Sequence, residues 1–272
     1  GYDLWHLVAE GPAEQLNLTE RTQPAMLAAG VAAFRVWRKL TDVTPGWMAG
    51  HSLGEYTALV CAGAIDFEVA VALVAERGRL MQSAVEPGSG AMAAILGLDD
   101  AKVVKVCVAL STDDEVVTPA NFNSPGQVVI AGHASAVNRA IEAVKLEGAK
   151  KAVPLPVSVP SHSPLMAAAA LQFRETLANV TVREFSIPVV HNVDVMTHPT
   201  AKDLRSALEQ QLSAPVRWSD TVRFLAEQGV SRFIECGPGK VLSGLNKRIV
   251  KEAQIEAIFD PNSLIKALEL VK

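Results

Sequence analysis

The sequence predicts an α/β protein in which helices cover a mostly parallel sheet and a small subdomain is inserted. Three observations lead to this class. Apolar strand-like runs alternate with helical segments through most of the chain, which is typical of parallel sheets. A Gly-x-Ser-x-Gly sequence at residues 50–54 lies between an apolar run and an alanine-rich segment, which indicates a sharp strand-to-helix turn. Between residues 90 and 155 the order changes to strand, helix, strand, strand, helix, strand.

The first predicted element is a buried helix at residues 22–40. Thr22 is expected to cap it, and Pro24 suits its first turn because proline is favoured there. The apolar residues expected to fill this helix are Met26, Leu27, Val31, Phe34, Val36 and Leu40.

A short strand at residues 47–49 is predicted to lead directly into the turn that carries Ser52. Helices follow at 53–62 and 67–85, the second with Asp66 as its N-cap. The order is therefore strand, serine turn, helix, helix.

The segment from residue 90 to 155 predicts an autonomous small sheet with two helices on one face, in the ferredoxin-like order βαββαβ. Its strands are expected at 90–98, 116–122, 127–131 and 151–155, with a turn at 123–126 and helices at 99–109 and 134–146. We interpret residues 89–157 as a subdomain inserted into a large α/β domain made of residues 1–88 and 158–272.

Strands and helices alternate again after the insertion. Helices are predicted at 165–178, 201–212, 217–228 and 240–250, and strands at 187–191 and 232–236.

Composition limits the classes of function. The chain has 272 residues, 49% apolar and 20% charged, which is enough for a large and a small domain. A net charge of −4 without a basic run argues against nucleic-acid binding. The three cysteines are far apart, and no apolar run approaches the ~20 residues of a membrane span, so we expect a cytoplasmic location. The first residues lack a signal segment and a methionine, so we expect the chain to begin partway into a longer protein.

The serine turn predicts a nucleophile, Ser52, although glycine and serine also form ordinary turns. A serine needs a base within hydrogen-bond reach. Among six histidines, His162 is the strongest choice because it lies in a constrained Pro-Ser-His-Ser-Pro loop. His51 adjoins the nucleophile but is expected to be structural, and His191 closes an apolar strand as a core histidine.

A triad acid is harder to place. Asp66, Asp99 and Asp113 lie between the serine and the histidine, but none ends an apolar strand, which weakens a plain hydrolase interpretation. A backbone carbonyl is the alternative group for orienting the imidazole.

Arg77 and Arg79 flank a glycine within an otherwise apolar helix. Each alone is best explained as a solvated surface arginine. If one points inward, its guanidinium is suited to a carboxylate partner, as an acyl group with its own carboxylate would provide.

Five motifs in order resemble the malonyl-CoA:acyl carrier protein transacylases, and the resemblance covers the whole length, with most likeness to the discrete bacterial enzymes. The motifs are Gly-His-Ser-Leu-Gly-Glu-Tyr (50–56), Arg-Gly with Met-Gln (77–82), Asn-Phe-Asn-Ser-Pro-Gly-Gln (121–127), Pro-Ser-His (160–162) and Gly-Pro-Gly-Lys (237–240). The resemblance implies an α/β-hydrolase-like large domain with an inserted ferredoxin-like one and the active site between them.

By position, the resemblance implies that Ser52 is the nucleophile, His162 the base and Arg77 the ligand of the malonyl carboxylate. The Gln211 carbonyl is implied to orient the histidine, and the Leu53 N–H to hold the oxyanion. The residues implied to line the cleft from the small subdomain are Asn121 and Asn123.

The implied reaction is a ping-pong transfer of malonyl from malonyl-CoA to the phosphopantetheine thiol of acyl carrier protein, by a monomer that needs no metal or bound cofactor. Basic residues expected at the carrier surface are Lys240, Lys247, Arg248 and Lys251, although an ordinary solvated helix face explains them equally well. A serine hydrolase using the same dyad, and a non-catalytic scaffold, are the competing classes.

One departure from the family concerns the start of the chain. Family members open with a strand and a Pro-Gly-Gln-Gly-Ser-Gln loop, whose first glutamine supplies a second oxyanion donor. Loss of one such donor costs about 2.7–4 kcal/mol of transition-state stabilisation. We expect that this segment exists in the complete protein.

Overall fold

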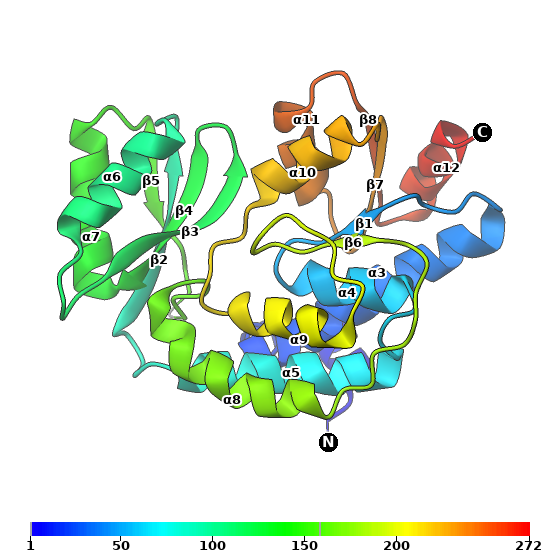
Figure 1. Ribbon diagram of the computed structural model, residues 1–272, viewed down its shortest axis with the longest axis horizontal. Helices are drawn as coiled ribbons and strands as arrows, with labels where there is room; N and C mark the ends of the chain where they lie inside the picture. Colours follow the sequence, from blue (N-terminus) through cyan, green and yellow to red (C-terminus); the bar gives the residue numbers. More distant parts are fainter. Residues whose placement is uncertain (1, 158) are drawn as a thin grey trace.

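A computed structural model describes residues 2–157 and 159–272 and confirms the α/β class, with helices surrounding short strands (Figure 1). β1 (Met48–Ala49) pairs in parallel with β6 (Val189–Val190), and β7 (Arg232–Cys236) pairs in parallel with β8 (Gln254–Ile258). Within the described residues these are two separate two-stranded sheets. The accompanying helices are α1 (Leu4–Glu10), α2 (Ala13–Leu16), α3 (Thr19–Leu40), α4 (Leu53–Cys61), α5 (Phe67–Ser83), α8 (Ala167–Ala178), α9 (Ala201–Gln210), α10 (Trp218–Glu227), α11 (Val241–Ile249) and α12 (Pro261–Leu270), with a 3-10 turn η1 (Pro164–Met166).

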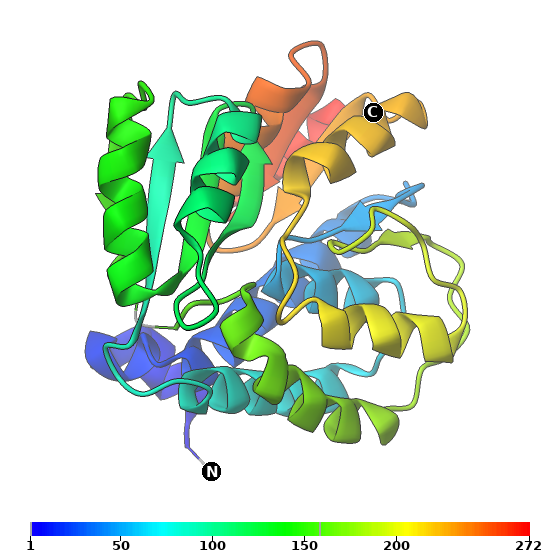
Figure 2. The ribbon, with the colours of Figure 1, turned by 60° about the vertical axis from the view of Figure 1, so that its left-hand side comes forward.

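A four-stranded antiparallel sheet stands beside this body, with two helices packed on it (Figures 1 and 2). The chain order of its elements is strand, helix, strand, strand, helix, strand, and the spatial strand order is β3-β4-β2-β5. The elements are β2 (Gly90–Leu96), α6 (Asp100–Leu110), β3 (Val117–Ser124), β4 (Gln127–His133), α7 (Ala134–Leu146) and β5 (Lys151–Pro154). We call this set the small sheet. Valine, isoleucine and alanine side chains fill the space between its strands and helices.

The helix predicted at residues 22–40 begins earlier, at Thr19, and Thr22 is not its cap. Thr22 instead lies within the first turn of the helix, and its hydroxyl donates to the Leu16 carbonyl at 2.5 Å. The prediction of a buried helix fails for three of its six apolar residues, because Met26, Val36 and Leu40 are 44%, 45% and 58% exposed. Helices α4 and α5 cover only one stripe of α3, which leaves these side chains on its outer face.

A glycine lets α3 and α5 pack closely. A Cβ on Gly78 would lie 2.6 Å from the Glu20 Cα, so α5 can approach the start of α3 this closely only without a side chain there. The approach places the buried Gln23 of α3 beside Arg77 of α5. Close helix packing therefore shapes one wall of the site described below.

The small sheet is joined to the main body by backbone pairing as well as by the chain. The Val216 N–H donates to the Ala120 carbonyl at 2.8 Å, and the Phe122 N–H donates to the Val216 carbonyl at 2.9 Å. Asn121 and Val216 form a parallel bridge. The segment that ends at Val216 is therefore fixed to strand β3.

Several predicted boundaries differ from the structure. The strand predicted at 187–191 is only the two residues of β6, and β3 runs on to Ser124, so the predicted turn begins later, at Pro125. Asp66 precedes α5, but its side chain accepts no capping hydrogen bond and pairs with Arg183. Four elements lie outside the predicted set: α1, α2, β8 and α12.

In the part of the chain that is described, no helix is long and apolar enough to cross a membrane.

Candidate active site at the serine turn

Ser52 lies at a sharp turn between β1 and α4. Its φ of 51° and ψ of −107° are unusual for a residue with a side chain, and such strain is characteristic of functional sites. A Cβ on Gly50 would lie 1.9 Å from the Gly54 carbonyl carbon, so only glycine fits at the first position. The turn places a half-buried hydroxyl at the start of α4, where unpaired backbone N–H groups gather.

The structure brings His162 to Ser52 from the loop before η1. Its Nε2 lies 2.7 Å from the Ser52 Oγ, and its Nδ1 lies 2.7 Å from the Gln211 backbone carbonyl. Because a carbonyl only accepts, Nδ1 carries the proton and Nε2 is free to accept from the serine hydroxyl. His162 has a φ of 60° and donates its backbone N–H to the Leu212 carbonyl at 3.0 Å. The imidazole is thus fixed in the orientation and tautomer of a base.

The pKa of His162 is lowered to about 3, chiefly because burial disfavours the imidazolium and also because the Arg77 charge is close. The imidazole is therefore neutral at physiological pH, which is the form that can accept a proton. Any group that offsets the Arg77 charge will raise the basicity of His162.

Arg77 is buried, with 1% of its surface exposed. Its Nη2 donates to the Ser52 Oγ at 3.1 Å and to the Gln211 Oε1 at 3.0 Å, and its Nη1 donates to the Gln23 Oε1 at 2.7 Å. Arg79 instead lies on the exposed side of α5 and pairs with Glu76. Of the two arginines considered, the structure places Arg77 at the nucleophile.

The guanidinium of Arg77 has no carboxylate partner. Across residues 2–157 and 159–272 no aspartate or glutamate forms an ion pair with it, and its buried Nε has no hydrogen-bond acceptor. The face of the Tyr56 ring lies 5.3 Å from the guanidinium carbon. A buried cation of this kind favours an anionic ligand, since burial without a counter-charge is costly.

Three polar residues at the site lie outside the set that sequence reasoning identified. Asn192 accepts the Ser52 N–H, Glu55 accepts the Gln211 side-chain amide at 2.9 Å, and Gln23 holds Arg77. Glu55 belongs to the extended serine motif, which was a signal for it; Asn192 and Gln23 carry no local signal of this kind.

The remaining predicted residues take different positions. The Leu53 N–H makes no hydrogen bond to any described residue, so it is available beside Ser52. The Asn123 Oδ1 lies 2.8 Å from the His51 Nε2, and this contact ties the small sheet to the serine turn. The Asn121 Oδ1 is buried without a partner among the described residues. His51 also packs beside Trp218, and burial lowers its pKa, which agrees with a structural residue.

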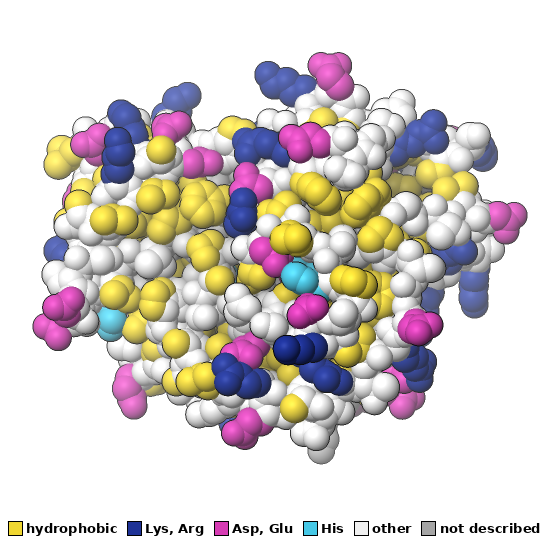
Figure 3. All heavy atoms as spheres, viewed as in Figure 1, with side chains coloured by type: hydrophobic (Ala, Val, Ile, Leu, Met, Phe, Trp, Pro, Cys, Tyr) yellow, Lys and Arg dark blue, Asp and Glu magenta, His cyan; other side chains and the backbone are white. Residues whose placement is uncertain are grey.

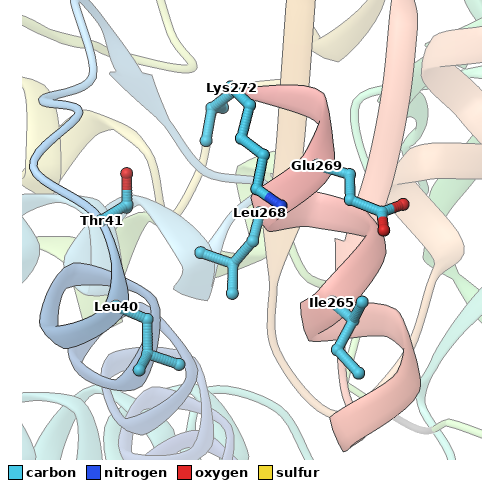
Figure 4. A pocket seen from close by; sticks show the side chains of 7 residues that line it. Leu40, Thr41, Ile265, Leu268, Glu269 and Lys272 are labelled. Atoms are coloured by element: carbon cyan, nitrogen blue, oxygen red, sulfur yellow. The ribbon is translucent and has the colours of Figure 1, made fainter.

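Two surface hollows lie away from the serine. Figure 4 shows one of about 190 Å³ between the end of α3 and helix α12, with Leu40, Ile265 and Leu268 on its walls. The other, of about 380 Å³, lies where α6 and β3 meet α10, and Phe122, Arg217 and Arg223 line it. Neither contains the Ser52 hydroxyl.

Comparisons with known proteins agree with this geometry. Residues 1–259 match the family described as acyl transferase domain. The chain is 55% identical over 270 residues to the malonyl CoA-acyl carrier protein transacylase of Escherichia coli K12, covering 99% of this chain and 87% of that protein. The transacylase of Bacillus subtilis is 44% identical, with 98% and 84% covered.

Solved structures give the same result. The malonyl CoA-acyl carrier protein transacylase of Coxiella burnetii superimposes with a TM-score of 0.97 at 49% identity, covering 100% of this chain and 86% of that one. A malonyl-transacylase in complex with its type II polyketide acyl-carrier protein matches with a TM-score of 0.96 at 54% identity, covering 99% and 87%. The chain therefore belongs to the acyl transferase family, and within it to the malonyl CoA-acyl carrier protein transacylases.

Proposed function

We propose that this chain transfers the malonyl group of malonyl-CoA to the phosphopantetheine thiol of an acyl carrier protein through a malonyl ester of Ser52. The single observation that carries the proposal is Arg77, a buried cation without a counter-charge at 3.1 Å from the nucleophilic oxygen. The malonyl group offers a thioester for Ser52 and a carboxylate for Arg77. The product supplies extender units for fatty acid synthesis.

In the first half-reaction, His162 Nε2 takes the Ser52 proton while the serine oxygen attacks the thioester carbonyl. The Leu53 N–H stabilises the resulting oxyanion. As the carbon–sulfur bond breaks, the proton on His162 passes to the sulfur and CoA leaves as a thiol. The malonyl group remains on Ser52 as an ester, with its carboxylate bound to Arg77.

In the second half-reaction, His162 accepts the proton of the carrier's phosphopantetheine thiol. The sulfur attacks the ester, the bond to the serine oxygen breaks, and the proton returns to Ser52. Because the malonyl carboxylate offsets the Arg77 charge, its binding removes one of the causes that lower the pKa of His162. The substrate thus makes the base stronger when it is needed.

The same proposal covers the finer architecture. We assign residues 1–88 and 158–272 to an α/β-hydrolase-like domain and residues 89–157 to an inserted ferredoxin-like one. The order β2-α6-β3-β4-α7-β5 and the antiparallel arrangement β3-β4-β2-β5 support this assignment. Asn121 and Asn123 lie on β3, the strand of the small sheet that adjoins the site, and we assign them to the cleft lining.

The acceptor in this proposal is an acyl carrier protein, as in the complex found among the solved structures. Figure 3 shows acidic and basic side chains interspersed on the pictured face, without a large patch of one sign. The basic residues of α11, Lys247 and Arg248, with Lys240 and Lys251 at its ends, stay the proposed contact for an acidic carrier. The enzyme is proposed to act in the cytoplasm as a monomer without a metal or bound cofactor.

Intact mass after incubation with malonyl-CoA tests the function. The parent should gain one malonyl group, Ser52→Ala should gain none, and acyl carrier protein should remove the adduct with formation of malonyl-carrier. Discharge to water at the same rate without carrier would indicate a hydrolase instead. Absence of an adduct would refute malonyl transfer, and an adduct that persists on Ser52→Ala would refute the assignment of Ser52 as the nucleophile.

A further inference from the structure

We propose that Asn192 is a positioning residue that holds the strained serine turn in its reactive geometry; this inference rests on the proposed function of Ser52. Asn192 lies just after β6 and has no exposed surface. It is 140 residues from the nucleophile in sequence. Its side chain bonds neither Arg77 nor His162; both of its side-chain hydrogen bonds go to the backbone of the serine turn.

The side-chain amide of Asn192 binds both sides of the turn. Its Oδ1 accepts the Ser52 N–H at 2.7 Å, and its Nδ2 donates to the Gly50 carbonyl at 2.7 Å. One planar amide therefore pairs with the backbone of Gly50 and of the nucleophile Ser52, as a neighbouring strand would. Only a group with an acceptor and a donor side by side can make both bonds, and asparagine is the shortest residue that has them.

These two bonds also decide which N–H groups remain for catalysis. The Ser52 N–H is occupied by Asn192, whereas the Leu53 N–H makes no bond to a described residue. We call the two side-chain hydrogen bonds of Asn192 the clamp. The clamp occupies the Ser52 N–H and leaves the Leu53 N–H for the oxyanion.

Backbone strain occurs at the serine turn, at the base and in the turn that contains Asn192. Among the described residues, three that are not glycine have positive φ: Ser52 at 51°, His162 at 60° and Val195 at 63°. The first two are the proposed nucleophile and base. Val195, whose β-branched side chain makes this region costly, lies in the tight turn after Asn192. Such strain persists only where the surrounding structure fixes it, and here the strained turn contains Asn192 and sets the position of its side chain.

Two hydrogen bonds of its own backbone hold Asn192 in place. Its N–H donates to the Glu55 Oε2 at 2.9 Å, and its carbonyl accepts the Arg217 N–H at 3.2 Å. Glu55 is fully buried and also accepts from the Gln211 side chain and lies 2.7 Å from the His191 Nδ1. One carboxylate thus joins the clamp to Gln211, whose carbonyl orients His162. Nucleophile and base are positioned by one connected set of bonds.

The experiment compares Asn192→Ala and Asn192→Asp with the parent. Two rates are measured: malonyl transfer, as kcat and KM, and inactivation by phenylmethylsulfonyl fluoride. This sulfonyl fluoride reacts with Ser52 but carries no carboxylate for Arg77, so its rate of inactivation reports the geometry of the nucleophile alone. Misplacement of a reacting group by about 1 Å costs on the order of 100-fold in rate. For Asn192→Ala we expect kcat to fall about 100-fold, KM to stay within about threefold, and sulfonylation to slow in parallel with kcat.

Asn192→Asp keeps the volume and the acceptor for the Ser52 N–H but sets a carboxylate oxygen against the Gly50 carbonyl. It should also lose kcat and sulfonylation rate, and it provides the test where the alanine variant does not fold. Asn179→Ala is the matched control, because Asn179 is exposed at the end of α8 and its side chain donates to the Glu175 carbonyl, away from the site. This control should leave both rates unchanged.

The proposal is overturned if a folded Asn192 variant keeps its kcat and sulfonylation rate within threefold of the parent. It is equally overturned if these variants melt earlier while their folded fraction reacts at the parental rate, since the residue would then serve stability alone. The two proposals fail separately. If the parent protein reacts with the sulfonyl fluoride but forms no malonyl adduct, malonyl transfer is refuted. The effect of Asn192 on the rate of sulfonylation can still be measured.

Discussion

Replacement of Arg77 by alanine should abolish the preference for malonyl-CoA over acetyl-CoA. Truncating one partner of a buried, hydrogen-bonded charge pair costs about 2–5 kcal/mol. At about 1.4 kcal/mol for each factor of ten, this lowers kcat/KM for malonyl-CoA by roughly 30- to 4,000-fold. Acetyl-CoA has no carboxylate for the guanidinium, so it loses no ion pair when Arg77 is removed, and any effect through the Arg77 contacts with Ser52 and Gln211 is common to both substrates. The ratio of the two kcat/KM values should therefore approach one.

The assay follows release of the CoA thiol with both substrates and acyl carrier protein as acceptor. Arg79→Ala is the matched control, because Arg79 has the same charge on the same helix but pairs with Glu76 at the surface. Arg77→Lys adds a second comparison, since a lysine keeps the charge but cannot span Gln23, Gln211 and Ser52 together. Unchanged selectivity in a folded Arg77→Ala enzyme would refute the role of this residue.

Three further predictions concern the base, the turn and the helix contact. The kcat/KM for malonyl-CoA should hold steady as pH falls through 6.5, because the neutral form of His162 is the active one and its pKa lies below that value. Arg77→Ala should move the acidic limb of this profile to higher pH, and a parental limb at or above 6.5 would contradict the burial argument. Gly50→Ala should destabilise the protein by about 3 kcal/mol in urea unfolding, since its Cβ overlaps the Gly54 backbone. Gly54→Ala should be neutral or stabilising in the same measurement, because among the described residues nothing beyond its chain neighbours and its own helix backbone lies within 4 Å of its Cβ position. Gly78→Ala should push α5 away from α3 and raise the KM for malonyl-CoA, with kcat less affected, as steady-state kinetics will show.

The residues found from sequence are those whose chemistry is encoded locally. Ser52 lies within a glycine pattern that the backbone geometry requires, and His162 lies in a proline-bound loop. The core interpretation of His191 agrees with its complete burial. That Glu55 is its partner could not be inferred, because the two residues are 136 positions apart and meet only after β1 and β6 pair.

The parts that could not be predicted depend on contacts between distant segments. Gln23 carries no signal in the sequence, because its contact with Arg77 exists only through the packing of α5 against α3. Asn192 comes just after the strand predicted at 187–191, but nothing in the sequence shows that its side chain reaches the serine turn 140 residues away. The exposed face of α3 was misjudged for the same reason: its apolar residues indicate a helix, but which stripe is covered depends on where α4 and α5 lie.

The backbone ladder between Val216 and β3 has a mechanical consequence. The six residues 211–216 begin at the carbonyl that holds the imidazole and end in pairing with the small sheet. A displacement of the small sheet relative to the main body would therefore be passed along this segment to the carbonyl that orients His162. Replacing the small sheet by that of a related enzyme would change one wall of the cleft and also the position of the imidazole.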